Sequence, residues 1–101
     1  MKLMGISAKN RAYLRSLGAK IKPSLNLGKG EVDESFVKAL SNALKAHELV
    51  KIRILQNSDE DLSSLSASLS ERCGSEVVAI TGKTILLWKA NDKNPIIKLP
   101  R

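Results

Sequence analysis

Basic side chains near the N-terminal end are the residues of this chain best suited to chemistry. The first thirty residues hold seven Lys or Arg and no Asp or Glu, whereas the other 71 hold ten of each kind, so the net charge of +7 comes from one end. Charge separated in this way is typical of a surface that binds a phosphate backbone. Arginine can bind phosphate through two parallel hydrogen bonds. The candidate contacts are Arg11, Arg15, Lys20 and Lys22.

A glycine-rich segment, Gly28-Lys29-Gly30-Glu31, lies where a strand pattern gives way to a helix pattern. Glycines let a phosphate approach backbone N–H groups without a Cβ in the way, and a helix N-terminus adds partial positive charge. Gly28, Lys29 and Gly30 are therefore a candidate phosphate-binding loop. The alternative is a tight turn with a solvated lysine. The spacing GxxxxGK[ST] of a nucleotide-binding P-loop is absent.

Two further basic residues, Lys51 and Arg53, alternate with apolar residues in the segment LVKIRIL. This alternation predicts a strand whose basic side chains share one face of a sheet. If that face is open, Lys51 and Arg53 extend the basic surface. If a helix covers it, they lie at its rim with their aliphatic stems packed. Both alternatives remain open from the sequence.

Several other polar or aromatic residues have structural explanations beside the functional ones. Trp88 could stack on an unpaired base, but its apolar strand favours a core or half-buried position. His47 is expected to cap the last carbonyls of a helix, and Cys73 to be a buried thiol. The acids at 59–61 could bind a metal, but they suit a helix start without one. With one His and one Cys, no zinc site of these residues alone forms in a single chain. We expect no metal, no cofactor and no enzymatic activity.

The elements that position these residues are predicted from apolar spacing and capping residues. Helices are expected over residues 7–20, 33–47 and 58–73, and strands over 24–27, 49–55, 76–81 and 84–90. Ser7 and Asp33 are the expected N-caps of the first two helices, and Gly74 is expected at the C-terminal end of the third. Gly82-Lys83 predicts a two-residue hairpin turn. The order α-β-α-β-α-β-β predicts an α/β fold with a four-stranded mixed sheet. Strands joined through helices should pair in parallel by right-handed crossovers, and the final hairpin is antiparallel.

Length and composition indicate a single domain over residues 1–101, with a core over about 3–90 and an extended tail over 91–101. One cysteine excludes an internal disulfide, which suits a reducing compartment. No apolar run approaches the length of a membrane span, and no signal-peptide pattern is present. A cytoplasmic protein without a membrane partner is expected.

Three segments in fixed order carry a family resemblance: KNRAYLRSLGAKIKPSLNLGKGE, ALKAHELVKIRIL and VVAITGKTILLWKANDKNPIIKLP. In them the chain resembles the YhbY-like CRM (chloroplast RNA splicing and ribosome maturation) domain family, over about residues 3–100. The resemblance implies a small RNA-binding domain similar in fold to the C-terminal domain of translation initiation factor three. It also implies a Gly-x-x-Gly loop after the first strand. Here Glu31 stands at the second glycine, and the neighbouring Gly30 is the candidate for its flexible role.

Charge and resemblance together imply a non-enzymatic RNA-binding protein that acts in ribosome assembly. The expected partner is a precursor of large-subunit ribosomal RNA, and no DNA is expected. Contacts to the sugar-phosphate backbone position a protein without reading sequence. The alternatives are a translation-linked factor on mature ribosomes or tRNA, and a basic adapter for an acidic protein partner. The oligomeric state is open, with a monomer favoured.

Overall fold

The computed structural model describes residues 8–27, 33–55 and 62–90. The predicted order of elements is confirmed there, with boundaries that differ by one or a few residues. The predicted cap Ser7, the glycine loop, the acids at 59–61 and the tail over 91–101 lie outside the described residues. The elements are α1 (Ala8–Lys20), β1 (Leu25–Leu27), α2 (Glu34–His47), β2 (Leu49–Ile54), α3 (Leu62–Cys73), β3 (Glu76–Thr81) and β4 (Thr84–Trp88).

The four strands form one mixed sheet in the order β1-β2-β4-β3. β1 pairs in parallel with β2, and β4 pairs antiparallel with both β2 and β3. The expectation that strands joined through helices pair in parallel is therefore correct for β1 and β2 but wrong for β2 and β3, because β4 lies between them. β4 has three consecutive buried residues, Ile85–Leu87. A strand that is apolar on both faces is best placed in the middle of a covered sheet.

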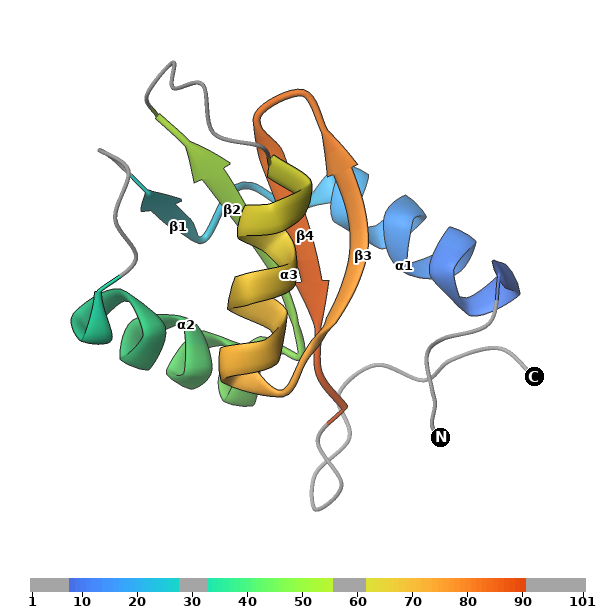
Figure 1. The fold of residues 1–101 in the computed structure, drawn as a ribbon. Coiled ribbons are helices and arrows are strands. Elements are labelled where there is room, and N and C mark those ends of the chain that lie inside the picture. Colours follow the sequence, from blue (N-terminus) through green and yellow to red (C-terminus); the bar gives the residue numbers. More distant parts are fainter. Residues whose placement is uncertain (1–7, 28–32, 56–61, 91–101) are drawn as a thin grey trace.

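Helices cover both faces of the sheet, α2 and α3 on one side and α1 on the other (Figure 1). On the first side, Leu40 and Leu44 of α2 and Leu69 of α3 belong to the same buried cluster as Ile52 and Ile85 of the sheet. This cluster is the larger of two apolar cores. Its helices follow the predicted apolar stripes, since burial of apolar area is what fixes an amphipathic helix on a sheet.

Helix ends are set by local hydrogen bonds as the sequence predicts. The Asp33 carboxylate accepts a hydrogen bond from the Phe36 backbone N–H at 2.8 Å, which confirms Asp33 as the N-cap of α2. At the end of α3, Gly74 has a φ of 66°, and the Ser75 N–H donates to the Ser70 carbonyl at 2.9 Å. This is the arrangement of a glycine C-cap, in which a positive φ turns the chain out of the helix.

Candidate nucleic-acid interface

The smaller core fixes α1 on its face of the sheet, near one end of the strands. Leu14 of α1 is fully buried and packs with Leu49, Val78 and Leu86. Trp88, the register partner of Leu49, packs against the same cluster and is half-buried. The structural interpretation of Trp88 is therefore confirmed. Its indole Nε1 is buried without a hydrogen-bond partner in the described part of the chain.

Farther along the strands, the face that carries α1 presents polar residues instead of apolar ones. Side chains two apart on a strand share a face, so Arg53 lies on the same face as Lys51 and Leu49. Arg53 is in register with Asn26 of β1 and Thr84 of β4, and Thr84 is in register with Thr81 of β3. Thr84 is half-buried and the other three are exposed. These four residues, here named the polar row, are Asn26, Arg53, Thr84 and Thr81.

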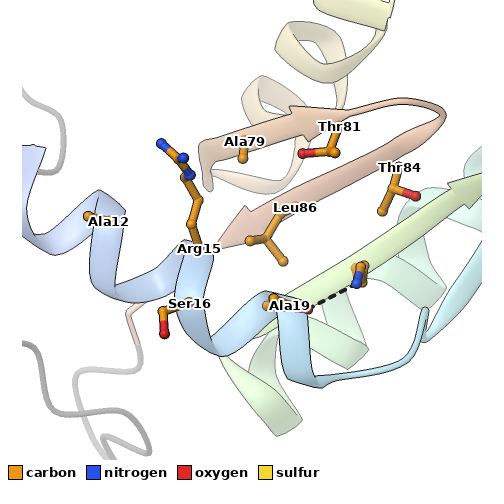
Figure 2. Close-up of a pocket in the computed structure, with 10 residues that line it drawn as sticks. Ala12, Arg15, Ser16, Ala19, Ala79, Thr81, Thr84 and Leu86 are labelled. Carbon is orange, nitrogen blue, oxygen red and sulfur yellow. Dashed lines mark hydrogen bonds between the residues drawn. The ribbon is translucent and has the colours of Figure 1, made fainter.

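A groove of about 660 Å³, here named the α1 groove, lies between one side of α1 and the β3–β4 hairpin. Figure 2 shows the side chains of α1 on one wall and those of the hairpin on the other. Two members of the polar row therefore line the groove together with basic and small residues of the helix. Its lining includes Ala12, Arg15 and Ala19 from α1 and Thr81, Thr84 and Leu86 from the hairpin.

One edge of the α1 groove is set by a close contact between α1 and β4. A Cβ added at Gly18 would lie 2.5 Å from Cδ2 of Leu86, closer than real side chains pack. Gly18 therefore lets the last turn of α1 approach the sheet. Beside it, the Lys51 Nζ donates to the Gly18 carbonyl at 3.0 Å and to the Ile21 carbonyl at 3.2 Å. The first of these bonds is drawn in Figure 2. Lys51 thus caps the C-terminal end of α1.

Arg11 fixes the other half of α1 to the edge strand β3. The register of β3 shifts between Val77 and Ala79, as at a β-bulge. The Arg11 Nη1 donates to the carbonyls of Val77 and Val78, the second at 3.1 Å. A bulge disrupts the ladder locally, so its carbonyls need other donors. Arg11 is therefore a structural residue as well as a predicted phosphate contact.

The structure divides the other predicted basic contacts by their surroundings. Arg15, Lys20, Lys22 and Arg53 are exposed, whereas Lys51 is half-buried. The sequence left open whether the sheet face with Lys51 and Arg53 is exposed or covered by a helix. Lys51 lies at the covered part, at the rim beneath α1, and Arg53 lies at the exposed part, in the polar row. Each alternative is therefore correct for one residue.

The predicted loop residues Gly28, Lys29, Gly30 and Glu31 lie outside the described residues, but the strand that leads to them is described. β1 ends at Leu27, which pairs with Ile54, and the Ile54 N–H donates to the Lys83 carbonyl of the hairpin turn at 2.8 Å. The chain thus leaves the described region one residue after Asn26, at the end of the sheet that carries the polar row.

The other polar residues considered in the sequence, His47 and Cys73, lie at the end of α2 and in α3. The His47 side chain is exposed, and the Glu48 backbone N–H donates to the Leu44 carbonyl at the end of α2. Cys73 is a buried free thiol, as predicted, and its Sγ lies 3.5 Å from the Ser41 Oγ. Among residues 8–27, 33–55 and 62–90, no group of His, Cys, Asp or Glu could hold a metal. No helix within those ranges is long and apolar enough to cross a membrane.

The sequence patterns did not mark three residues of the candidate interface: Asn26, Thr81 and Thr84. Each is a single neutral polar residue at a strand end, and no spacing rule marks such a residue as functional. The only available signal was their alternation with apolar neighbours, which places them on one face of each strand. The register that aligns them across the strands depends on β4 entering the centre of the sheet.

The fold and the surface together define a class of protein. It is an α/β domain of three helices and a four-stranded mixed sheet, with a basic, acid-free helix on one face. The chain belongs to the CRS1/YhbY (CRM) domain family, whose model matches residues 6–89. The predicted family resemblance is thereby confirmed.

Relatives in distant organisms match nearly the whole chain. The "Probable RNA-binding protein YqeI" of Bacillus subtilis is 35% identical, covering 94% of this chain and 99% of its own. The "Probable RNA-binding protein PA4753" of Pseudomonas aeruginosa is 27% identical over 89% of this chain and 86% of its own. The solution structure of the hypothetical protein SAV1595 from Staphylococcus aureus has a TM-score of 0.81 and 36% identity, covering 94% of this chain and 99% of its own. The first two relatives are named as RNA-binding proteins and not as enzymes. The third shares the fold of this chain.

Proposed function

We propose that this protein binds RNA through the face of the sheet that carries α1. The observation that carries the proposal is the placement of charge. α1 contains no Asp or Glu, and its exposed Arg15 and Lys20 lie on the same side of the sheet as Arg53. Exposed cations on one surface attract a phosphate backbone. The RNA-binding names of the relatives support the same class of ligand.

The backbone contacts in this proposal come from α1, the segment after it and β2. Arg15, Lys20, Lys22 and Arg53 contact phosphates directly, because they are exposed. Arg11 and Lys51 add positive potential while their hydrogen bonds fix α1. The loop Gly28-Lys29-Gly30 follows β1 in the sequence and adds backbone N–H donors for a further phosphate.

We further propose that the RNA is a precursor of large-subunit ribosomal RNA and that the protein acts in ribosome assembly in the cytoplasm, without catalysing a reaction. The support is the resemblance to a family named for ribosome maturation, together with the exposed cations on the α1 face of the sheet. A protein with this surface can bind structured RNA by shape, which a folding ribosomal RNA offers.

A sucrose-gradient profile of the tagged protein in cell lysate, with and without RNase, tests this function. Co-migration with large-subunit precursors that is lost after RNase treatment is the expected result. Migration with mature ribosomes or with tRNA indicates a translation-linked factor instead. A complex that survives RNase indicates an acidic protein partner and overturns RNA binding as the function of this surface.

A further inference from the structure

We propose that the α1 groove holds one unpaired nucleotide of the bound RNA. This inference rests on the proposed function and adds a base-binding site to the phosphate contacts. It implies that RNA with an unpaired segment is preferred over a continuous duplex. The observations that carry it are the size of the groove, its mixed apolar and polar lining, and the cations on its two sides.

The α1 groove has room for a base and a surface that suits one. Its volume of about 660 Å³ falls within the roughly 300–1,000 Å³ of small-molecule sites. Leu86 and Ala79 of the sheet line it beside Ala12 and Ala19 of α1. A nucleobase has two flat faces that are poorly hydrated, and small aliphatic side chains on opposite walls leave room for a ring between them.

Polar groups in the α1 groove can bind the edge of a base. Thr81 and Thr84 are register partners on adjacent strands and contribute two hydroxyl groups to one wall. Each hydroxyl can donate one hydrogen bond and accept two, so the pair can bind both donors and acceptors of a base edge. Contacts of this kind read base identity, whereas phosphate contacts do not.

Cations flank the α1 groove where the backbone of a bound strand would run. Arg15 lines it and is exposed. Arg53, the register partner of Thr84, lies next to it in the polar row. No Asp or Glu is among the described residues that line it. A nucleotide with its base in the groove can therefore place its phosphates toward Arg15 or Arg53 without meeting a carboxylate.

A base-paired nucleotide cannot enter this site. In an A-form duplex, the bases are stacked and the major groove is too deep and narrow for side chains to read. A base reaches the α1 groove only from a loop, a bulge or a single strand, where unstacking costs least. The inference therefore names unpaired RNA as the substrate class of this surface.

Filling the α1 groove tests the inference with little risk to folding. Ala19 is exposed on α1 and lines the groove, so Ala19→Leu adds bulk there without burying a new side chain in the core. The matched control is Ala39→Leu, at an exposed position of α2 on the opposite side of the sheet (Figure 1). Both substitutions keep good helix formers. Thermal unfolding followed by circular dichroism verifies that each variant is folded.

The probes are single-stranded homopolymers of each of the four ribonucleotides and a blunt RNA duplex, measured by fluorescence anisotropy. We expect Ala19→Leu to weaken binding to the best homopolymer about ten-fold, the order of what one bound base contributes, because the leucine excludes the base from the groove, and to leave duplex binding unchanged. Ala39→Leu should bind like the wild type. Equal binding of the best homopolymer by wild type and folded Ala19→Leu would overturn the inference.

A second variant tests the hydrogen bonds to the base edge without changing the volume of the groove. Thr84→Val keeps the shape and β-branching of the side chain but removes its hydroxyl. The order of affinities among the four homopolymers should then change. An unchanged order means that Thr84 reads no base edge and contradicts that part of the inference. Wild-type protein that binds neither homopolymers nor duplex refutes the proposed function itself, whereas binding that is insensitive to Ala19→Leu refutes only the base site.

Discussion

Arg11 and Arg15 lie one helical turn apart, yet the structure gives them different surroundings. Arg11 is half-buried and donates hydrogen bonds to the bulge of β3, whereas Arg15 is exposed and lines the α1 groove. A double charge reversal at both positions therefore combines two effects. Loss of RNA affinity in that variant would not separate a lost phosphate contact from a weakened fold, so the two residues need separate substitutions.

Arg11→Met is expected to lower the free energy of unfolding by about 1–3 kcal/mol, the cost of leaving buried acceptors without a charged donor. Methionine keeps an unbranched apolar stem, so mainly the hydrogen bonds are lost. Urea denaturation measures the change. Arg15→Met is the matched control, and its unfolding free energy should stay within about 0.5 kcal/mol of the wild type, as for ordinary surface substitutions. Equal stability of the two variants would contradict the structural role of Arg11.

Arg15→Met should instead weaken RNA binding while the protein stays folded. The substitution removes a positive charge beside the α1 groove but leaves in place the hydrogen bonds by which Arg11 and Lys51 fix α1 to the sheet. Anisotropy titration against one fixed RNA measures the change. Lys38→Met, at an exposed position of α2, is the control for loss of charge away from this face. An equal loss of affinity in both variants would point to net charge rather than to this surface.

Residue types alone predicted part of the candidate site. The absence of acids near the N-terminal end marked α1 as basic, and the alternation in β2 marked Lys51 and Arg53 as neighbours on one face. The sequence could not separate exposed cations from bonded ones. The partners of Arg11 and Lys51 are backbone carbonyls more than 30 residues away in the chain, at Val77 and Gly18 respectively. A carbonyl carries no sequence signature, so such contacts appear only in the folded structure.

At the level of elements, the start of α2 depends on one side chain. Asp33 accepts a hydrogen bond from the Phe36 N–H and lies at the positive end of the helix dipole. Asp33→Ala should lower the free energy of unfolding by about 1 kcal/mol, the usual cost of losing an N-cap. Asp33→Asn retains the acceptor and should lose less. Thermal denaturation of the three proteins gives the comparison, and equal losses in Asn and Ala variants would exclude the capping bond as the cause.

The packing of α1 on β4 requires a residue without a side chain at position 18. Gly18→Val places three carbons where a Cβ already meets Leu86, so we expect a loss of about 2 kcal/mol or more from overpacking. Gly18→Ala should lose less, because alanine recovers about 1 kcal/mol of helix propensity over glycine. Chemical denaturation measures both variants. A Gly18→Val protein as stable as the wild type would mean that α1 can move away from the sheet without cost.

Elements were easier to predict than their pairing. The three helices, the N-cap Asp33, the cap Gly74 and the Gly82-Lys83 turn all follow from local spacing and turn chemistry, and the structure has them at the expected places. The insertion of β4 between β2 and β3 depends on which strands bury most area together, which no local pattern specifies. The bulge in β3 is likewise a property of the sheet and of Arg11.

At the scale of the whole molecule, one face carries the charge that the proposed function uses. RNA affinity should therefore fall linearly with salt on logarithmic axes, with a slope of roughly −0.7 to −0.9 per phosphate neutralised. Arg15→Gln should reduce that slope by about one such unit, because one phosphate contact is lost. Anisotropy titrations at several salt concentrations measure both. A flat salt response in the wild type would rule out a mechanism that depends on phosphate contacts.

The two outer strands of the sheet bear on how the protein behaves at high concentration. Unpaired strand edges are templates on which a second molecule can add a strand and begin aggregation. β1, at one edge, has only three residues, and β3, at the other, is irregular and has two carbonyls already bonded to Arg11. Neither edge offers a long, regular row of free backbone groups. The hydrogen bonds that fix α1 to the sheet therefore also oppose growth of the sheet from one molecule to the next.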